Sequence, residues 1–367
     1  MKSSWVQRKE KRQRMAILTT CIGAYPKPDY VPMVDWFQLE KGLTATGGEV
    51  TRRASETITG AGDEAEALYV RATKEAIEDQ CEAGIDIPTD GEQRRENYIH
   101  YHCRHLNGID FENLTSRILR DGAYTAELPT INGKVTPRGN HFLDHDFKVA
   151  QGFTDRPVKI TVPGPTTIMD TTANTHYADD KELAFDLADA MNFEIRALAD
   201  AGCRFIQVDE PIFARNVERA LAYGVECLDR CFHGVPDGVT RVMHMCCGYP
   251  EHLDDEIYHK ADRNSYFRLA EAVDASSVDQ VSIEDAHRHN DLSLLEKFRR
   301  STVIFGAVAI AKSEVETVDA IAGRLTQACD HIDRDRLIAA PDCGLAILGR
   351  DLARRKLANL CAAAKRI

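Results

Sequence analysis

The chain has 367 residues, which is long for an average domain and suits a single α/β barrel with additional loop segments. A hydrophobic share of 43% and a charged share of 28% are typical of a globular protein with a large core. The formal net charge of -12 argues against nucleic acid and anionic membrane surfaces as partners, because both are bound through excess Lys and Arg. No apolar run approaches the roughly 20 residues of a membrane helix.

The first residues, MKSSWVQRKEKRQRM, are basic but lack the apolar stretch of a signal peptide. We interpret residues 1–15 as a solvated arm and residues 16–367 as a single catalytic domain. The 11 cysteines are an odd number in a chain without an export signal, which argues against a disulfide framework. We therefore expect a cytoplasmic protein with reduced cysteines, and the sequence leaves a homo-oligomer open.

Eight short β-type runs alternate with segments of helical periodicity. The predicted strands are residues 16–26, 84–92, 158–165, 205–211, 239–248, 280–287, 302–310 and 337–344. The alternation predicts an α/β fold with a parallel sheet, and the count of eight predicts closure into a (β/α)8 TIM barrel. A doubly wound open sheet is the alternative, but no Gly-rich phosphate-binding fingerprint follows an early strand.

Two longer connections interrupt this rhythm, and we interpret both as insertions, after strands two and four. Residues 101–156 join the second and third predicted strands, are rich in Gly, Asp, His and Thr, and predict a hairpin or lid. Residues 215–237 follow the fourth predicted strand and carry a helix and a loop.

Metal-binding side chains recur where predicted strands end, which is the face at which barrel enzymes have their active sites. His244 and Cys246 are two residues apart in the fifth strand, so both point to the same face. Glu284 ends the sixth strand and Cys343 ends the eighth. Taken alone, each of these four residues can be interpreted as an ordinary buried or strand-end residue that binds no metal. Together they offer one imidazole, two thiolates and one carboxylate, a donor set that suits tetrahedral Zn2+.

These motifs resemble the C-terminal catalytic barrel of the cobalamin-independent methionine synthases. The stretches HMC, SIE and PDCG stand where that family has its zinc ligands, which implies His244, Cys246, Glu284 and Cys343 as ligands here. The resemblance extends over residues 19–350 and lacks the family's N-terminal duplicate barrel, so we expect a single-barrel member. It implies a zinc-dependent methyl or alkyl transferase, in which a homocysteine-like thiol binds Zn2+ as the thiolate and attacks an alkyl donor.

The resemblance also implies where the amino-acid acceptor binds. Glu92 and Asp209 stand where the family holds the amino group of homocysteine, and two carboxylates in a cleft suit an ammonium ion. The stretch IGAYP matches the first-strand loop that holds the carboxylate, which implies substrate-binding roles for Ile22 and Ala24. The family usually has Ser at position 24, but backbone N–H groups remain available. For the two acids, a hydrogen-bond network at the barrel mouth is the alternative interpretation.

Two positions depart from the folate-dependent members of the family. Thr171 stands where these have a Trp that stacks on the pterin, and Ala311 where they have a catalytic His. The alkyl donor is therefore open: it is a folate held differently, or not methyltetrahydrofolate at all. Lys312 would offer a charge to the leaving group, and His102 or His105 in the stretch ENYIHYHCRH is the expected replacement acid. The same stretch would line the donor pocket with Tyr98, His100, Tyr101 and His102. The alternatives are a solvated lysine and lid-packing residues.

A zinc-dependent thiol transferase of the epoxyalkane–coenzyme M type is the second functional hypothesis. The missing folate features favour it, but a sulfonate-bearing thiol would need a cation near the metal, such as Arg94, Arg95 or Lys312. The carboxylates of Glu92 and Asp209 favour an amino-acid thiol instead. A zinc-stabilised scaffold is the third hypothesis, although structural zinc sites are usually closed, Cys-rich and local in sequence.

Overall fold

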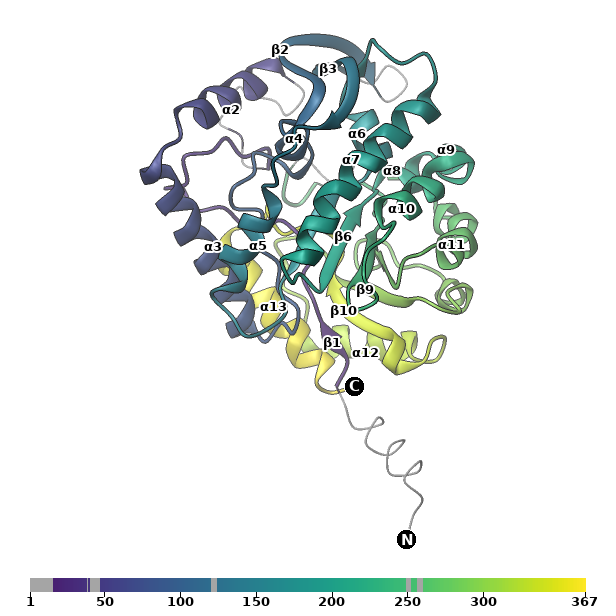
Figure 1. The fold of residues 1–367 in the computed structure, drawn as a ribbon. Helices are drawn as coiled ribbons and strands as arrows, with labels where there is room; N and C mark the ends of the chain where they lie inside the picture. The colour runs from purple at the N-terminus through teal and green to yellow at the C-terminus, as the bar shows by residue number, and fades with distance from the viewer. Residues whose placement is uncertain (1–15, 38, 40–46, 120–123, 249–251, 256–259) are drawn as a thin grey trace.

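The computed structural model describes residues 16–37, 39, 47–119, 124–248, 252–255 and 260–367, so the predicted arm lies outside the described residues (Figure 1). The described chain is an α/β fold built on a curled sheet of seven parallel strands in the order β1-β10-β9-β8-β7-β6-β4. The strands are Leu18–Thr19 (β1), Lys159–Pro163 (β4), Phe205–Asp209 (β6), Thr240–His244 (β7), Gln280–Ile283 (β8), Thr302–Val308 (β9) and Leu337–Pro341 (β10).

The second predicted strand forms no regular strand, but it connects the two edges of this sheet. Ile87 bridges in parallel to Thr20 beside β1, and Thr89 bridges in parallel to Lys159 at the start of β4. The segment is interrupted at Pro88, which has no backbone N–H to donate to a neighbouring strand. The curled sheet is therefore linked edge to edge, which is consistent with a TIM-barrel-like fold.

Helices cover the outer face of the sheet, as Figure 1 shows for α3, α7 and α13. The longer ones are α2 (Gly48–Gly60), α3 (Asp63–Ala83), α5 (Leu143–Gln151), α7 (Asp180–Asp200), α10 (Val225–Cys231), α11 (Ser265–Ala275), α12 (Val318–Ala328) and α13 (Arg350–Ala364). The shorter ones are α4 (Tyr98–Cys103), α6 (Pro165–Asp170), α8 (Ile212–Arg215), α9 (Val217–Arg219), η2 (Ala220–Gly224), η3 (Leu292–Lys297) and η4 (Arg334–Arg336). Gly84 ends α3 in the left-handed conformation, at φ 106°, which glycine adopts without strain. Among the described residues, none of the helices combines the length and apolar character needed to cross a membrane.

The core has two parts because successive strand residues point to opposite faces of the sheet. Outward-pointing residues such as Ile160 and Val162 pack against the helices in one large cluster. Inward-pointing residues form a small apolar cluster inside the curl, made of Ile22, Val242, Ile304, Ile338 and Ala340. Polar residues further along the same strands line the inside at the carboxyl ends, which is where the predicted site residues lie.

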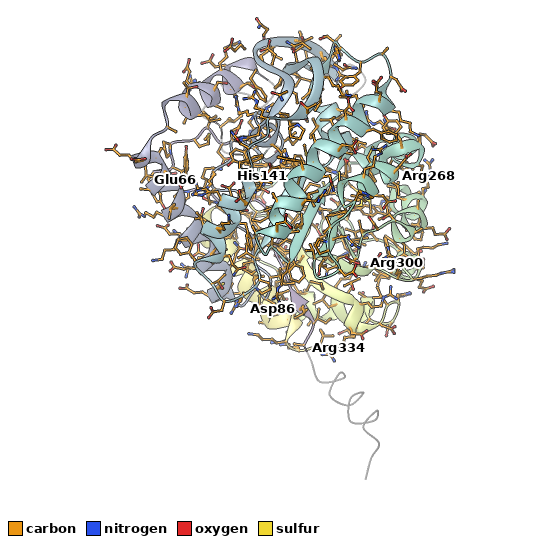
Figure 2. The ribbon with its side chains drawn as sticks, viewed as in Figure 1. Glu66, Asp86, His141, Arg268, Arg300 and Arg334 are labelled. Atoms are coloured by element: carbon orange, nitrogen blue, oxygen red, sulfur yellow. The ribbon has the colours of Figure 1, made fainter. Side chains whose placement is uncertain are left out.

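The predicted hairpin in residues 101–156 is present as β2 (Leu106–Leu119) and β3 (Tyr124–Pro137), which pair antiparallel, and β5 (Ala173–Asn174) joins β3. The hairpin lies at the top of the molecule in Figure 1, whereas β1 lies at the bottom. Figure 2 shows Asp86 and Arg334 at this lower end, and the Thr19 backbone N–H donates to the Asp86 carboxylate over 2.8 Å.

Candidate metal centre and substrate site

Three of the four predicted metal ligands lie together at the ends of β7 and β10. His244 ends β7, Cys246 follows it, and Cys343 follows β10. One ligand atom of each lies within 4.8 Å of the other two, and Cys343 Sγ is 3.4 Å from His244 Nε2. One imidazole and two sulfurs at this spacing fit Zn2+, which takes three protein ligands and one exchangeable ligand in catalytic sites.

The orientation of His244 is fixed by its neighbour on the next strand. His244 of β7 pairs in register with Ser282 of β8, and its Nδ1 is 2.9 Å from the Ser282 hydroxyl oxygen. This contact leaves Nε2 as the ring nitrogen that faces Cys343. Metal-binding histidines commonly have such a partner on the second nitrogen, which sets both tautomer and ring orientation.

Hydrogen bonds within the cluster shift the pKa values of the two cysteine thiols in opposite directions. A hydrogen bond from Cys343, together with the hydrogen bond and charge of His244, holds the pKa of the Cys246 thiol well below its usual range despite burial. The same hydrogen bond raises the pKa of Cys343 well above its usual range. Cys246 is therefore the preferred thiolate, and a metal that binds both sulfurs must release the Cys343 proton.

Glu284, the fourth predicted ligand, lies outside this three-residue group. Its carboxylate accepts hydrogen bonds from Lys260 Nζ at 2.7 Å and from the Cys247 backbone N–H at 3.2 Å. Burial, with the charge of Asp342, raises the pKa of Glu284. A ligand role for Glu284 stays a prediction, and it requires the carboxylate to share or leave its ion pair with Lys260.

Asp209 is next to the metal cluster because β6 is next to β7. Asp209 pairs in register with His244, and its Oδ1 accepts a hydrogen bond from Gln207 Nε2 at 2.7 Å. Burial raises the pKa of Asp209 to about 7; the charge of Glu92 adds to this rise, and His244 opposes it. Burial raises the pKa of Glu92 as well, and two buried carboxylates of this kind form an acidic site that a bound ammonium ion would stabilise.

Glu92 has an unusual backbone conformation, with φ at 56°, which is the left-handed region. Non-glycine residues in this region are uncommon and cluster at functional sites. The Glu92 Oε1 atom accepts a hydrogen bond from the Thr161 hydroxyl at 2.8 Å. A Cβ atom added to Gly23 would lie only 2.5 Å from the same oxygen, so the first-strand loop packs directly on Glu92.

The first-strand loop connects the acids to the metal cluster. The Ile22 carbonyl accepts a hydrogen bond from Gln207 Nε2 at 2.8 Å, while the Ile22 side chain belongs to the inner apolar cluster. The Ala24 carbonyl accepts the Leu345 N–H at 2.7 Å, two residues after Cys343. The structure therefore brings the predicted carboxylate-binding loop between Glu92 and Cys343.

His102 and Lys312, two predicted proton donors, are not part of the metal group. His102 is buried with its ring edge-on to Phe142 at 5.0 Å, and burial lowers its pKa well below the usual range. Lys312 is exposed and has no hydrogen bond or ion pair within the part of the chain that the structure describes. The Ala311 backbone N–H donates to His287 Nε2 at 3.0 Å. Catalytic roles for His102 and Lys312 stay predictions.

Tyr98 and Arg215 lie within electrostatic reach of the cluster, and the sequence did not single out Arg215 as a site residue. Burial raises the pKa of Tyr98 well above its usual range, and the charges of Asp209 and of the cluster cysteines add to this rise. The charge of Arg215 lowers the pKa of both Tyr98 and Cys246. Arg94 and Arg95, proposed as sulfonate partners, are instead paired with Asp146 at 3.4 Å and with Asp90 at 3.0 Å.

Replacing Ser282 with Ala should weaken zinc binding about 10–100-fold, because the substitution frees the His244 ring without removing a ligand. The measurement is competition with a fluorescent chelator. Ser277→Ala is the matched control, because the Ser277 hydroxyl has no hydrogen-bond partner within the described residues. Equal zinc affinities for the two variants would contradict the role of Ser282.

Comparison with known proteins supplies independent evidence. The family model described as "Cobalamin-independent synthase, Catalytic domain" matches residues 43–366. The chain belongs to the cobalamin-independent methionine synthase family. This membership confirms the resemblance seen in the metal-ligand motifs.

Relatives match this family member over almost its whole length. The methionine synthase of Sulfolobus acidocaldarius is 28% identical over 344 residues, which cover 93% of this chain and 89% of the relative. The methionine synthase of Thermococcus kodakarensis is 29% identical, with 93% of this chain and 90% of the relative covered. The solved B12-independent methionine synthase from Shewanella sp. W3-18-1, in complex with selenomethionine, superposes with a TM-score of 0.82 at 29% identity and covers 96% of this chain and 98% of its own.

Proposed function

We propose that the protein is a zinc-dependent methyltransferase that joins an alkyl group to the thiol of homocysteine or a similar amino acid. The observation that carries this proposal is the group of His244, Cys246 and Cys343 next to the carboxylate of Asp209. Family membership and the methionine synthases among the relatives support it. The selenomethionine bound to the Shewanella relative supports an amino-acid ligand with a thioether or thiol side chain.

Each part of the site has a separate task in this proposal. Zinc held by His244, Cys246 and Cys343 would lower the pKa of a bound thiol and so maintain it as a nucleophile. Asp209 and Glu92 hold the ammonium group of the acceptor. Backbone N–H groups of residues 22–24 hold the acceptor carboxylate, which fixes the direction from which the sulfur faces the alkyl donor.

Three further assignments belong to the proposal. Glu284 serves as the fourth, displaceable ligand. His102 or Lys312 supplies a proton to the leaving group. We also infer closure into a complete (β/α)8 barrel, which the bridges at Ile87 and Thr89 support, with residues 101–156 and 215–237 as insertions.

Calorimetric titration of the zinc-loaded protein tests the proposed function. L-homocysteine should bind with release of about one proton per site, because the thiol ionises on binding. Titrating in two buffers with different ionisation enthalpies counts that proton. Coenzyme M, the alternative acceptor, should bind more weakly because it has no ammonium group for the carboxylates of Asp209 and Glu92 to hold. Binding of coenzyme M alone would reject the amino-acid acceptor and favour the epoxyalkane type of reaction.

A further inference from the structure

Arg215, the last residue of α8, is a partly buried cation without an ion-pair partner in the part of the chain that the structure describes. Its Nε atom is buried and has no hydrogen-bond partner among the described residues. Among the arginines that the structure describes, it is the only one that is not exposed and whose side chain has neither a hydrogen bond nor an ion pair. Neither terminal nitrogen of the guanidinium is buried, so this end of the side chain can donate hydrogen bonds to a bound anion.

The position of Arg215 puts this cation at the candidate metal centre. Helix α8 follows β6, so Arg215 lies at the same strand ends as Asp209 and its register partner His244. Its charge acts on Cys246 of the metal group and on Tyr98, so the guanidinium is within electrostatic reach of the group at which the acceptor sulfur would bind.

The acceptor does not use Arg215 in the proposed arrangement. Its carboxylate lies at residues 22–24, in the loop after β1, and its ammonium group lies at Asp209 and Glu92. In the sheet, β6 is separated from β1 by β7, β8, β9 and β10 on one side. On the other side, β4 and the bridging segment around Ile87 lie between them. The unpaired charge is therefore left for the second substrate.

We propose that Arg215 is an anion-binding subsite for the alkyl donor, which binds a carboxylate, phosphate or sulfonate group of the donor and directs its alkyl carbon toward the acceptor sulfur. This inference rests on the proposed function. It also explains how a donor is held at a site where Thr171 offers no aromatic ring for stacking. Recognition then depends on charge-assisted hydrogen bonds from the planar guanidinium.

Two small electrophiles of similar size, one anionic and one neutral, test this subsite. Iodoacetate and iodoacetamide both alkylate a thiolate: an S–C bond forms, the C–I bond breaks and iodide leaves. With zinc-loaded protein and L-homocysteine, the initial rates of S-carboxymethyl- and S-carbamoylmethyl-homocysteine formation are measured after subtraction of the uncatalysed rates. In the Arg215→Gln variant, the iodoacetate rate should fall about tenfold relative to the iodoacetamide rate. Arg215→Lys should restore part of the difference.

A control variant and the homocysteine Kd distinguish a failure of the anion subsite from a failure of the proposed function. Arg196→Gln removes an exposed arginine of α7 that has no ion pair within the described residues, and it should leave the ratio of rates unchanged. Zinc content and the calorimetric Kd of L-homocysteine should be the same in Arg215→Gln and the wild type. A weaker homocysteine Kd would assign Arg215 to the acceptor and overturn the subsite. An unchanged ratio of rates would also overturn it, whereas failure of the wild type to bind homocysteine would overturn the proposed function as well.

Discussion

Replacing Cys246 or Cys343 with Ser will leave the protein almost free of zinc after dialysis against a weak chelator. Each substitution removes one of the three donors that lie within 4.8 Å of one another, and a serine hydroxyl does not ionise to replace a thiolate. Loss of a residue that only hydrogen-bonds to a metal ligand lowers metal affinity by up to ~100-fold. Loss of a ligand itself should lower the zinc affinity by more than this. Methyl transfer should be lost in both variants. Elemental analysis and chelator competition measure the zinc.

Cys247→Ser is the matched control for these two variants. Cys247 is adjacent to Cys246 in sequence, but its side chain packs in the core, where burial raises its pKa to about 12. The substitution buries a hydroxyl and should lower stability by about 1–2 kcal/mol while zinc is retained. If Cys246→Ser or Cys343→Ser kept its full zinc content, that residue would not be a ligand.

Asp209→Asn should weaken the binding of an amino-acid ligand about 30–150-fold while zinc remains bound. The substitution removes one charge of a buried ion pair with the ligand ammonium, a loss of about 2–3 kcal/mol. L-methionine is the suitable probe because it has no thiol, so calorimetry reports only the amino-acid part of the site. Asp155→Asn changes an exposed carboxylate in the same way and should leave the affinity unchanged.

The pH dependence of the same binding follows from the pKa of Asp209. Burial raises this pKa to about 7, so the side chain is mainly neutral at pH 6 and mainly ionised at pH 8. Since only the ionised form attracts ammonium, the wild-type affinity for L-methionine should rise between pH 6 and pH 8 and then level off. Asp209→Asn should have a flat profile. A flat wild-type profile would show that Asp209 is not the ammonium partner.

The strands were predictable because their signals are local. Alternating apolar residues bounded by Gly and Pro located six of the seven sheet strands to within a few residues, from β4 to β10. The first predicted strand was too long, because only Leu18–Thr19 is regular. The second reduces to bridges at Ile87 and Thr89, since Pro88 interrupts the hydrogen bonding.

The metal group was predictable for a geometric reason, and its surroundings were not. A spacing of two along a strand placed His244 and Cys246 on one face, and parallel strands brought Cys343 to the same end. The ion pair of Glu284 with Lys260 depends on how a loop folds back over the strand ends, which no pattern in the sequence reports. Arg215 was missed for a similar reason. That it has no ion-pair partner among the described residues can be seen only from the three-dimensional positions of the surrounding side chains.

The first strand of the sheet has its neighbour in the last. Leu18 pairs with Ile338 and Thr19 with Ala339, so β1 emerges from the ribosome long before its partner has been synthesised. The stretch of chain that completes this pairing also carries Cys343. A nascent chain that ends before β10 has an open sheet edge and lacks Cys343, one of the three donors of the proposed zinc site, so we expect it to hold the metal weakly. If the proposed zinc site is correct, stable metal uptake distinguishes finished chains from unfinished ones.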